Sequence, residues 1–348
     1  MNIAFIGVGN ISGIYLQNIT QRFTEMKIIG LCDLIEERAR SAAEKYGIGK
    51  VYKDMYEAFA DPEVDIILNI TRPYQHYEVS RQALLAGKHV YCEKPLGASF
   101  EEGKELVRLA EEKGLMIGGA PDTFLGAGIQ TCKQLIENDY IGRPVAASAF
   151  MLGSGPDSWH PDPASFYLYG GGPMMDMGPY YITALTYLMG RIESVVGMTA
   201  KTYPERLFTC KEHFGERGKV EVATHLTGSM RFESGAIGTI ITSFDVKKSI
   251  LTRIEIYGEK GTLIVPDPNT FGGPVKLYRP EDGQFRDMPL MFEHQSNSRG
   301  LGLLEMARAV RDGKKDFITS SKRTFHVLDV LTAFQRSEDS GSVVRMEK

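Results

Sequence analysis

The stretch NIAFIGVGNIS, residues 2–12, joins a short apolar run to a glycine-rich turn at the start of the 348-residue sequence. Asn2–Ile6 is apolar and rich in isoleucine, which favours a strand. Gly7 permits a tight turn, and Gly9 lets a ligand approach the backbone. Ser12 is small enough for close packing of helix on strand. A turn that follows a first strand and opens a helix predicts a pyrophosphate-binding turn formed by Gly7, Gly9, Asn10 and Ile11.

Short β-branched runs alternate with amphipathic segments through the first 120 residues. The expected strands are Asn2–Ile6, Lys27–Cys32, Lys50–Tyr52, Val64–Ile70, His89–Cys92 and Leu115–Gly118. The helical patterns between them include Ile35–Tyr46, Tyr74–Ala86 and Phe100–Lys113, the last with Ser99 as its N-cap. This alternation predicts a parallel sheet with right-handed crossovers, and therefore an α/β Rossmann domain over residues 1–120.

The second expected strand ends at Cys32 and is followed by Asp33. An acid about 20 residues beyond such a turn binds both ribose hydroxyls of NAD, and its charge repels the 2′-phosphate of NADP. The alternative interpretation of Asp33 is a helix N-cap. Because the turn and the acid occur together, we predict NAD rather than NADP as the cofactor.

Polar side chains follow the fourth and fifth expected strands, in ITRPYQH (residues 70–76) and CEKP (residues 92–95). Ligands of an open parallel sheet collect beyond the carboxyl ends of its strands. A Glu-Lys pair in a loop is usually a solvated ion pair, but a lysine at this edge can bind a substrate hydroxyl and help to carry its proton. Lys94 is thus a catalytic and substrate-binding candidate. The cofactor-binding candidates at this edge are Thr71, Arg72, His76, Glu93 and Lys94.

The periodicity changes after Gly118. The expected strands there are Val145–Phe150, Val195–Thr202, Val220–Phe232, Ala236–Phe244, Thr252–Tyr257 and Gly261–Val265, and the expected helices are about 126–138, 303–315 and 324–336. This pattern predicts an α+β domain over residues 121–348 with a largely antiparallel open sheet. We expect one face of this sheet to be left uncovered by helices and to carry the apolar residues Ile237, Ile240 and Phe244. Because a large exposed apolar patch usually marks an interface, this face predicts a homodimer or homotetramer.

The segment GGGPMMDMGPYY, residues 170–181, has a proline suited to the first turn of a helix. Asp176 and Tyr180 are four residues apart, so on one continuous helix they would share a face. The alternative makes Tyr180 a core aromatic residue and Asp176 a partner of the helix dipole.

Five features of the sequence can be read together: GVGNIS, Asp33, ALLAGKHVYCEKPLG (residues 83–97), GGGPMMDMGPYY and GEKGTL (residues 258–263). With these features the chain resembles the glucose–fructose oxidoreductase, inositol dehydrogenase and rhizopine-catabolism (Gfo/Idh/MocA) family over nearly its whole length. The resemblance implies an NAD-dependent dehydrogenase or reductase acting on a hydroxyl or keto carbon of a sugar, glycoside or cyclitol. It implies that Lys94 contacts the reacting hydroxyl and the nicotinamide, and that Asp176 positions the substrate or the lysine. In that family an acid–base histidine commonly stands at the position that Tyr180 occupies in this sequence. A free tyrosine has a pKa near 10, so Tyr180 needs a nearby cation to act as a base near neutral pH.

Two further segments carry candidates for substrate binding. SWHPDP, residues 158–163, places Trp159 beside His160, a pair suited to a sugar ring, although a structural plug is the alternative. His160 is also the rival of Tyr180 for proton transfer. GGAPDTFLG, residues 118–126, contains Asp122 and Phe124, and HQSNSRG, residues 294–300, adds Arg299 as a weaker candidate.

Composition excludes several classes of partner. A formal net charge of -4 and a pI near 6.0 argue against nucleic acid. No apolar run approaches the roughly 18 residues of a membrane span, and with no leader pattern we expect a cytoplasmic protein. The four cysteines form no CxxC pair, and with no histidine motif we expect no metal.

Two alternatives in function remain. One is an NAD-dependent glycosidase that oxidises transiently and eliminates, against which Lys94 argues. The other is a non-catalytic NAD-binding regulator, against which the intact set of Gly7, Gly9, Asp33, Lys94 and Asp176 argues.

Overall fold

The computed structural model describes residues 1–347, which divide into two compact units. The first unit comprises Met1–Asp122 and Asn297–Leu328. The second comprises Thr123–Ser296 and the residues from Asp329 onward. Among residues 1–347, none of the helices combines the length and the apolar character that crossing a membrane requires.

The first unit is built on a parallel sheet in the strand order β3-β2-β1-β4-β5-β6. Its strands are β1 (Asn2–Ile6), β2 (Lys27–Cys32), β3 (Lys50–Val51), β4 (Ile66–Asn69), β5 (His89–Cys92) and β6 (Ile117–Gly119). This is the order of a doubly wound dinucleotide-binding fold. The predicted Rossmann domain and its six strands are therefore confirmed, with ends that differ by at most two residues.

Helices alternate with these strands, which explains why the central strands β1 and β4 are apolar except for Asn2 and Asn69 at their ends. They are α1 (Ser12–Gln21), α2 (Glu36–Tyr46), α3 (Met55–Ala60), α4 (Pro73–Leu85) and α5 (Phe100–Lys113), followed late in the chain by α9 (Leu301–Arg311). All four residues of β4 are buried. The predicted cap of α5 is confirmed, because the Ser99 hydroxyl accepts the Glu102 N–H at 3.2 Å.

The second unit contains a sheet in the order β16-β15-β14-β13-β7-β12-β11-β8-β17. Its strands are β7 (Pro144–Leu152), β8 (Ile192–Ala200), β11 (His225–Phe232), β12 (Ile237–Ser243), β13 (Ile254–Gly258), β14 (Thr262–Val265), β15 (Val275–Tyr278), β16 (Arg286–Met288) and β17 (Val344–Arg345). Of the strand pairs in this sheet among the described residues, β12 with β7 is parallel and the others are antiparallel. The predicted, largely antiparallel sheet is confirmed. A separate hairpin is formed by β9 (Glu205–Leu207) and β10 (Arg217–Lys219).

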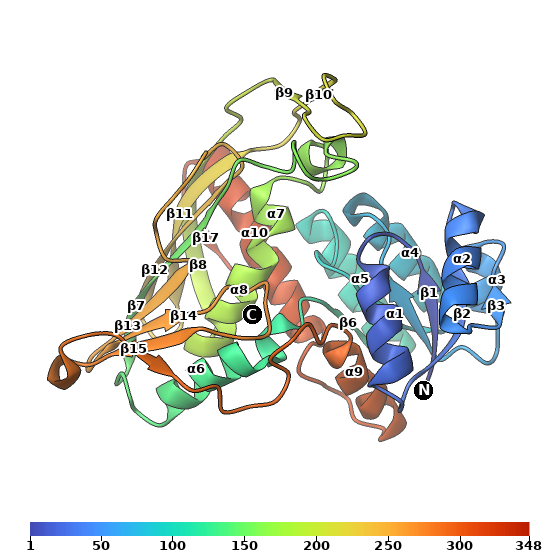
Figure 1. Cartoon of the computed structure of the whole chain (residues 1–348), viewed down its shortest axis with the longest axis horizontal. Coiled ribbons are helices and arrows are strands. Elements are labelled where there is room, and N and C mark those ends of the chain that lie inside the picture. Colours follow the sequence, from blue (N-terminus) through green and yellow to red (C-terminus); the bar gives the residue numbers. More distant parts are fainter. Residues whose placement is uncertain (348) are drawn as a thin grey trace. The chain divides into compact units, whose positions relative to one another are not determined.

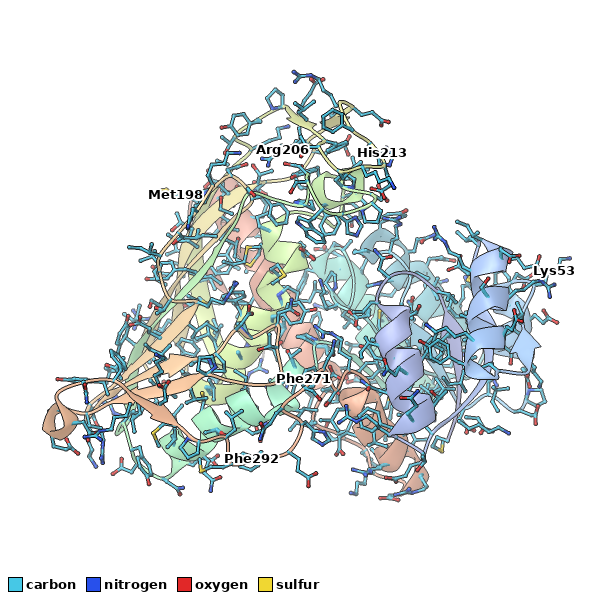
Figure 2. All side chains as sticks on the ribbon, in the orientation of Figure 1. Lys53, Met198, Arg206, His213, Phe271 and Phe292 are labelled. Atoms are coloured by element: carbon cyan, nitrogen blue, oxygen red, sulfur yellow. The ribbon has the colours of Figure 1, made fainter. Side chains whose placement is uncertain are left out.

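Helices α6 (Ala127–Glu137), α7 (Pro173–Asp176) and α8 (Gly178–Met189) pack on one face of this sheet (Figure 1). The other face exposes apolar side chains. Met198, which is labelled in Figure 2, is 72% exposed. Ile237 on β12 is 48% exposed. The prediction that Ile240 and Phe244 also lie on that exposed face is wrong, because both side chains are buried. Ile240 is three residues beyond Ile237, and side chains three apart on a strand point to opposite faces.

The prediction of one continuous helix through residues 173–181 is also wrong, because the structure has two helices there. The helix breaks at Met177, which ends α7 and precedes α8. Pro179 has no N–H to donate to a preceding turn, so α8 starts anew with the proline in its first turn. Asp176 and Tyr180 therefore lie on two different helices, and the rule that residues four apart share one helix face does not apply to them.

Candidate active site

The glycine turn between β1 and α1 is shaped to receive a phosphate. Gly7 has φ +101°, and a Cβ there would lie 2.7 Å from the Ile70 carbonyl oxygen, so only glycine fits. At Gly9 an added Cβ would meet nothing within 4 Å, which leaves open space beside the backbone. Asn10 is exposed and Ile11 half-buried, and α1 begins without a side-chain cap and without an acid in its first turn. This open helix N-terminus fits the pyrophosphate of a dinucleotide.

Asp33 ties the end of β2 to this turn. Its Oδ2 accepts the Val8 N–H at 2.6 Å, and its Oδ1 accepts the Ile35 N–H at 2.8 Å. The carboxylate is half-buried, and each oxygen retains a second lone pair for a ribose hydroxyl. Its place beside the turn fits the predicted ribose role. The alternative N-cap interpretation is wrong, because the N-cap residue of α2 is Ile35 and this helix has no side-chain cap.

The residues after β4 are organised by Asn69, a buried asparagine that no sequence motif distinguishes. Asn69 Oδ1 accepts the Thr71 hydroxyl at 2.7 Å. Asn69 Nδ2 donates to the His76 carbonyl at 3.0 Å and to the Ser80 hydroxyl at 2.9 Å. Thr71 and Arg72 are half-buried, and Arg72 precedes the first turn of α4.

His76 lies inside the first unit, 1% exposed. Its Nδ1 lies 2.6 Å from the Pro95 carbonyl and its Nε2 lies 3.2 Å from the Thr71 carbonyl. Burial lowers the pKa of His76, so the ring is neutral at neutral pH. A neutral ring has one N–H, so it donates to only one of these two carbonyls, of which the Pro95 carbonyl is the nearer. The predicted contact of His76 with the cofactor stays a prediction.

Glu93 follows β5 and is 7% exposed. Its Oε1 accepts the Tyr15 hydroxyl at 2.7 Å and its Oε2 accepts the Lys94 N–H at 3.0 Å. The acid of the Glu-Lys pair therefore anchors the strand end to helix α1 and fixes the backbone that carries Lys94. Lys94 itself is half-buried.

Asp122 follows β6 and is 1% exposed. Its Oδ2 accepts the N–H groups of Gly300 and Gly302 at 2.9 and 3.0 Å, which caps helix α9. Burial raises the pKa of Asp122 to about 6. Arg299 is also nearly buried, and its Nη1 donates to Asn297 Oδ1 at 2.8 Å. The structure thus gives both residues partners within the first unit, and their predicted contact with substrate stays a prediction.

In the second unit, Asp176 ends α7 and is half-buried, whereas Tyr180 lies in the first turn of α8 and is 6% exposed. The Tyr180 N–H donates to the Met177 carbonyl at 3.1 Å, across the helix break. Phe124 is 1% exposed, and its ring centre lies 4.9 Å from that of Tyr187. Such packing is typical of a core residue, and a role of Phe124 in binding substrate remains a prediction.

Trp159 and His160 lie in the loop between β7 and α7. Trp159 is 67% exposed, and its ring meets His160 edge-on at 5.4 Å between centres. The ring of Phe166 lies 4.7 Å from that of His160. The Asp162 N–H donates to His160 Nδ1 at 3.0 Å, so the neutral ring carries its proton on Nε2. The loop therefore offers an aromatic face next to a hydrogen-bond donor.

The strand order, the glycine turn and the acid after β2 define a dinucleotide-binding domain. Residues 1–119 match the model of the Gfo/Idh/MocA oxidoreductase family with its NAD-binding Rossmann fold, and residues 129–264 match a C-terminal domain of the same family. The chain belongs to the Gfo/Idh/MocA oxidoreductase family, and its cofactor is NAD. The predicted family and cofactor are confirmed.

Similar proteins carry named activities. The myo-inositol 2-dehydrogenase of Thermotoga maritima is 28% identical over 264 residues, which cover 76% of this chain and 74% of the relative. The D-glucoside 3-dehydrogenase of Escherichia coli is 23% identical over 99% of this chain and 97% of its own. A solved structure of levoglucosan dehydrogenase with NADH and levoglucosan superimposes with a TM-score of 0.82 at 21% identity, covering 100% of this chain and 99% of that one. That likeness shows the shared fold.

Proposed function

We propose that the protein oxidises a hydroxyl of a sugar, glycoside or cyclitol to a ketone with NAD⁺, or performs the reverse reduction. The observation that carries this proposal is the position of Lys94. It follows β5, which pairs with β4, and β4 pairs in turn with β1, which runs into the glycine turn. The carboxyl ends of these three parallel strands meet at one edge, where ligands of such sheets bind. Dehydrogenase relatives named for inositol and glucoside substrates support the substrate class.

The residues divide the reaction between them. Bound NAD⁺ supplies the acceptor for the hydride that leaves the hydroxyl-bearing carbon. Lys94 donates a hydrogen bond to the reacting oxygen and stabilises the negative charge that develops on it. In its phenolate form Tyr180 accepts the proton of that hydroxyl and becomes a neutral phenol, and Asp176 orients the substrate.

Two residues are candidates for proton acceptor, and the hydrogen bond of His160 favours Tyr180. His160 Nδ1 accepts the Asp162 N–H, so the proton of the neutral ring is on Nε2. In this state His160 can donate a hydrogen bond to a sugar oxygen but has no free nitrogen lone pair to receive a proton. We therefore assign His160 to substrate binding.

The proposal is tested by NADH absorbance at 340 nm with a panel of cyclitols, glycosides and levoglucosan. We expect net NADH formation with at least one of them. Lys94→Ala should lower turnover by about 10²–10⁴-fold while the Kd for NAD changes only a few-fold. Lys104→Ala, which changes an exposed lysine on α5, is the matched control. A Lys94→Ala enzyme with half the wild-type activity would make the Glu-Lys pair structural, and products without net NADH would indicate the glycosidase alternative.

The proton acceptor is tested by Tyr180→Phe, with Tyr181→Phe as the control. Tyr181 is the next residue on α8, also buried, and its hydroxyl accepts from Arg253 Nη1 at 3.2 Å. Tyr180→Phe should lower kcat by at least about tenfold with a smaller change in KM, because the lost interaction is made in the transition state. Tyr181→Phe should keep wild-type kcat. An unchanged Tyr180→Phe enzyme beside an inactive His160→Ala enzyme would transfer the role to the histidine.

A further inference from the structure

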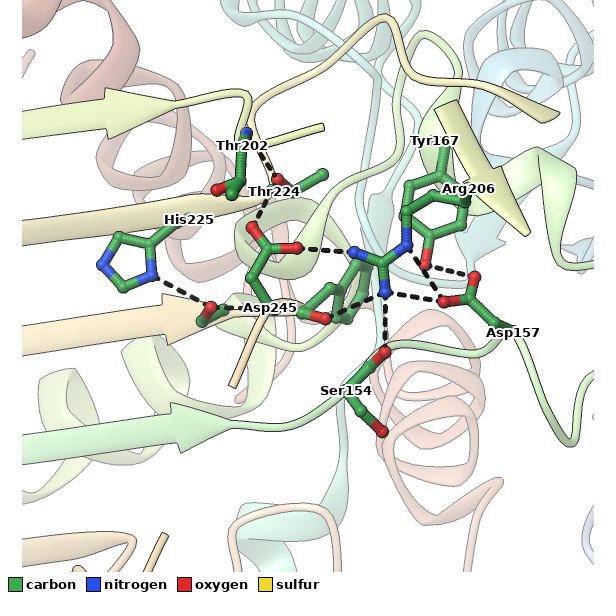
Figure 3. A network of polar contacts seen from close by, with 10 residues as sticks. Ser154, Asp157, Tyr167, Thr202, Arg206, Thr224, His225 and Asp245 are labelled. Carbon is green, nitrogen blue, oxygen red and sulfur yellow. Dashed lines mark hydrogen bonds and ion pairs between the residues drawn. The ribbon is translucent and has the colours of Figure 1, made fainter. Parts of the chain in front are cut away.

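A buried ion-pair network surrounds Arg206 of strand β9 in the second unit (Figure 3). Arg206 is 6% exposed, and each of its guanidinium nitrogens donates hydrogen bonds. Nε and Nη2 donate to Asp157 Oδ2 at 3.0 and 2.6 Å, and Nη1 donates to Asp245 Oδ1 at 2.5 Å. Nη2 also donates to the carbonyls of Ser154 at 2.8 Å and Phe244 at 3.2 Å. One side chain thus joins the loop after β7, the β9–β10 hairpin and the end of β12.

Each carboxylate of this network has a second partner. The Tyr167 hydroxyl donates to Asp157 Oδ1 at 2.7 Å, and the Thr224 hydroxyl donates to Asp245 Oδ2 at 2.7 Å. The Asp157 carbonyl in addition accepts the N–H groups of Thr209 and Cys210 at 2.8 and 2.9 Å. These second partners orient each carboxylate toward Arg206, which joins the two carboxylates to each other.

The backbone closes tightly over the network at Gly155. Its φ is +86°, and a Cβ there would lie 2.5 Å from the Tyr167 hydroxyl and 3.2 Å from Arg206 Nη2. The loop from Gly153 to Gly172 contains only a short 3₁₀ turn, Ala164–Tyr167. A loop of this length loses much conformational entropy on ordering and needs anchors.

We propose that Arg206 is a positioning residue for substrate recognition. By tying Ser154 and Asp157 to the hairpin and to Asp245, it holds the loop so that Trp159 and His160 offer one arrangement of ring face and Nε2–H donor to a pyranose or cyclitol ring. This inference rests on the proposed function. A buried ion pair adds little net stability over apolar packing of the same volume. The planar guanidinium does, however, set the direction of each hydrogen bond, which suits a residue that defines geometry.

The position of the loop can be measured without substrate, because Trp159 is the only tryptophan. Arg206→Met should increase acrylamide quenching of Trp159 fluorescence. The KM for the sugar should rise about tenfold or more while kcat changes less than about threefold, since binding rather than the chemical step loses its support. The Kd for NAD should stay at the wild-type value. Arg206→Lys should restore part of both effects, because an ammonium group can satisfy one carboxylate but not both in the same geometry.

Arg217→Met is the matched control, since Arg217 lies on the adjacent strand β10 with a side chain 65% exposed and 3.9 Å from Glu205. It should leave quenching and KM unchanged. A folded Arg206→Met protein with wild-type quenching and wild-type KM would overturn the proposal. Increased quenching with wild-type KM would overturn the role in recognition while leaving the dehydrogenase function intact. The absence of NADH formation by the wild type would contradict the proposed function instead.

If Arg206→Met does not fold, Asp245→Asn is measured by the same criteria. This variant removes one charge but keeps the side-chain shape and an acceptor for Thr224. Increased quenching with a raised KM would support the proposal, and wild-type values of both would overturn it.

Discussion

The hydrogen bond between Tyr15 and Glu93 predicts the effect of removing a single oxygen atom, in Tyr15→Phe. Tyr15 is fully buried in α1, and its hydroxyl donates to Glu93 Oε1 at 2.7 Å. Burial, followed by the charge of Glu93, raises the pKa of Tyr15 well above its usual value, so the hydroxyl stays a donor at all working pH values. The substitution would leave this carboxylate with the Lys94 N–H at 3.0 Å as its remaining partner through Oε2.

The expected magnitude follows from the charge and burial of the pair. A hydrogen bond to a charged acceptor contributes about 1.5–3 kcal/mol, and the loss is at the upper part of this range when the acceptor stays buried. In a domain of about 150 residues, each kcal/mol lowers Tm by about 2–4 °C. A loss of about 2 kcal/mol therefore lowers the Tm of the first unit by about 4–8 °C.

The assay is thermal unfolding followed by far-UV circular dichroism, with saturating NAD in a parallel series. Tyr46→Phe is the matched control, because the Tyr46 hydroxyl donates to a neutral acceptor, the Gly13 carbonyl, at 3.3 Å. It should cost less than about 1 kcal/mol. A Tyr15→Phe protein that melts within a degree of the wild type would refute the reasoning, since Glu93 would then be held by the backbone alone.

Three further outcomes are expected. The wild type should prefer NAD to NADP at least tenfold in kcat/KM, about 1.4 kcal/mol, and Asp33→Asn should reduce that preference; equal values for the two cofactors in the wild type would contradict it. Because burial raises the pKa of Asp122 to about 6, the folded chain binds this proton more tightly than the unfolded chain, and stability falls by about 3 kcal/mol as pH rises from about 4 to above 6. Asp122→Asn should flatten that part of the curve in denaturant titrations, and an unchanged slope would exclude Asp122 as its source. The sheet face with Met198 and Ile237 should join two copies of the chain, so sedimentation should give a dimer or tetramer, and Met198→Glu should weaken it; a wild-type monomer at micromolar concentration would disprove this interface.

The sequence predicted those parts of the fold that depend on local patterns. The parallel strands were identified because β-branched runs, glycine turns and helix caps all lie within a few residues of each other. The break at Met177 also has a local signal in the sequence, since Gly178-Pro179 disfavours an uninterrupted helix. The burial of Ile240 likewise follows from a local rule, because side chains alternate in direction along a strand.

Tertiary partners were beyond the reach of the sequence. Nothing near Arg206 indicates that its partners Asp157 and Asp245 lie 49 and 39 residues away in the chain. The same holds for Asp122, whose carboxylate accepts the N–H of Gly300, the N-cap residue of α9, 178 residues later. An acid or histidine beside a strand end looks the same in sequence whether it faces a ligand or closes a buried hydrogen bond. His76 and Glu93 show this, since both lie at the predicted edge and both bind the chain itself.

The division of candidates between the units makes the proposed roles separable by kinetics. The glycine turn, Asp33 and Lys94 belong to the first unit, whereas Asp176, Tyr180, Trp159 and His160 belong to the second. Substitutions in the second unit should therefore change the kinetics for the sugar and leave the Kd for NAD unaltered. Lys94 is the informative exception, because it belongs to the nucleotide-binding unit and is proposed to act on the sugar hydroxyl. If Lys94→Ala weakened NAD binding as strongly as it slowed turnover, the lysine would be a cofactor ligand, and proton transfer would have to rest on the second unit alone.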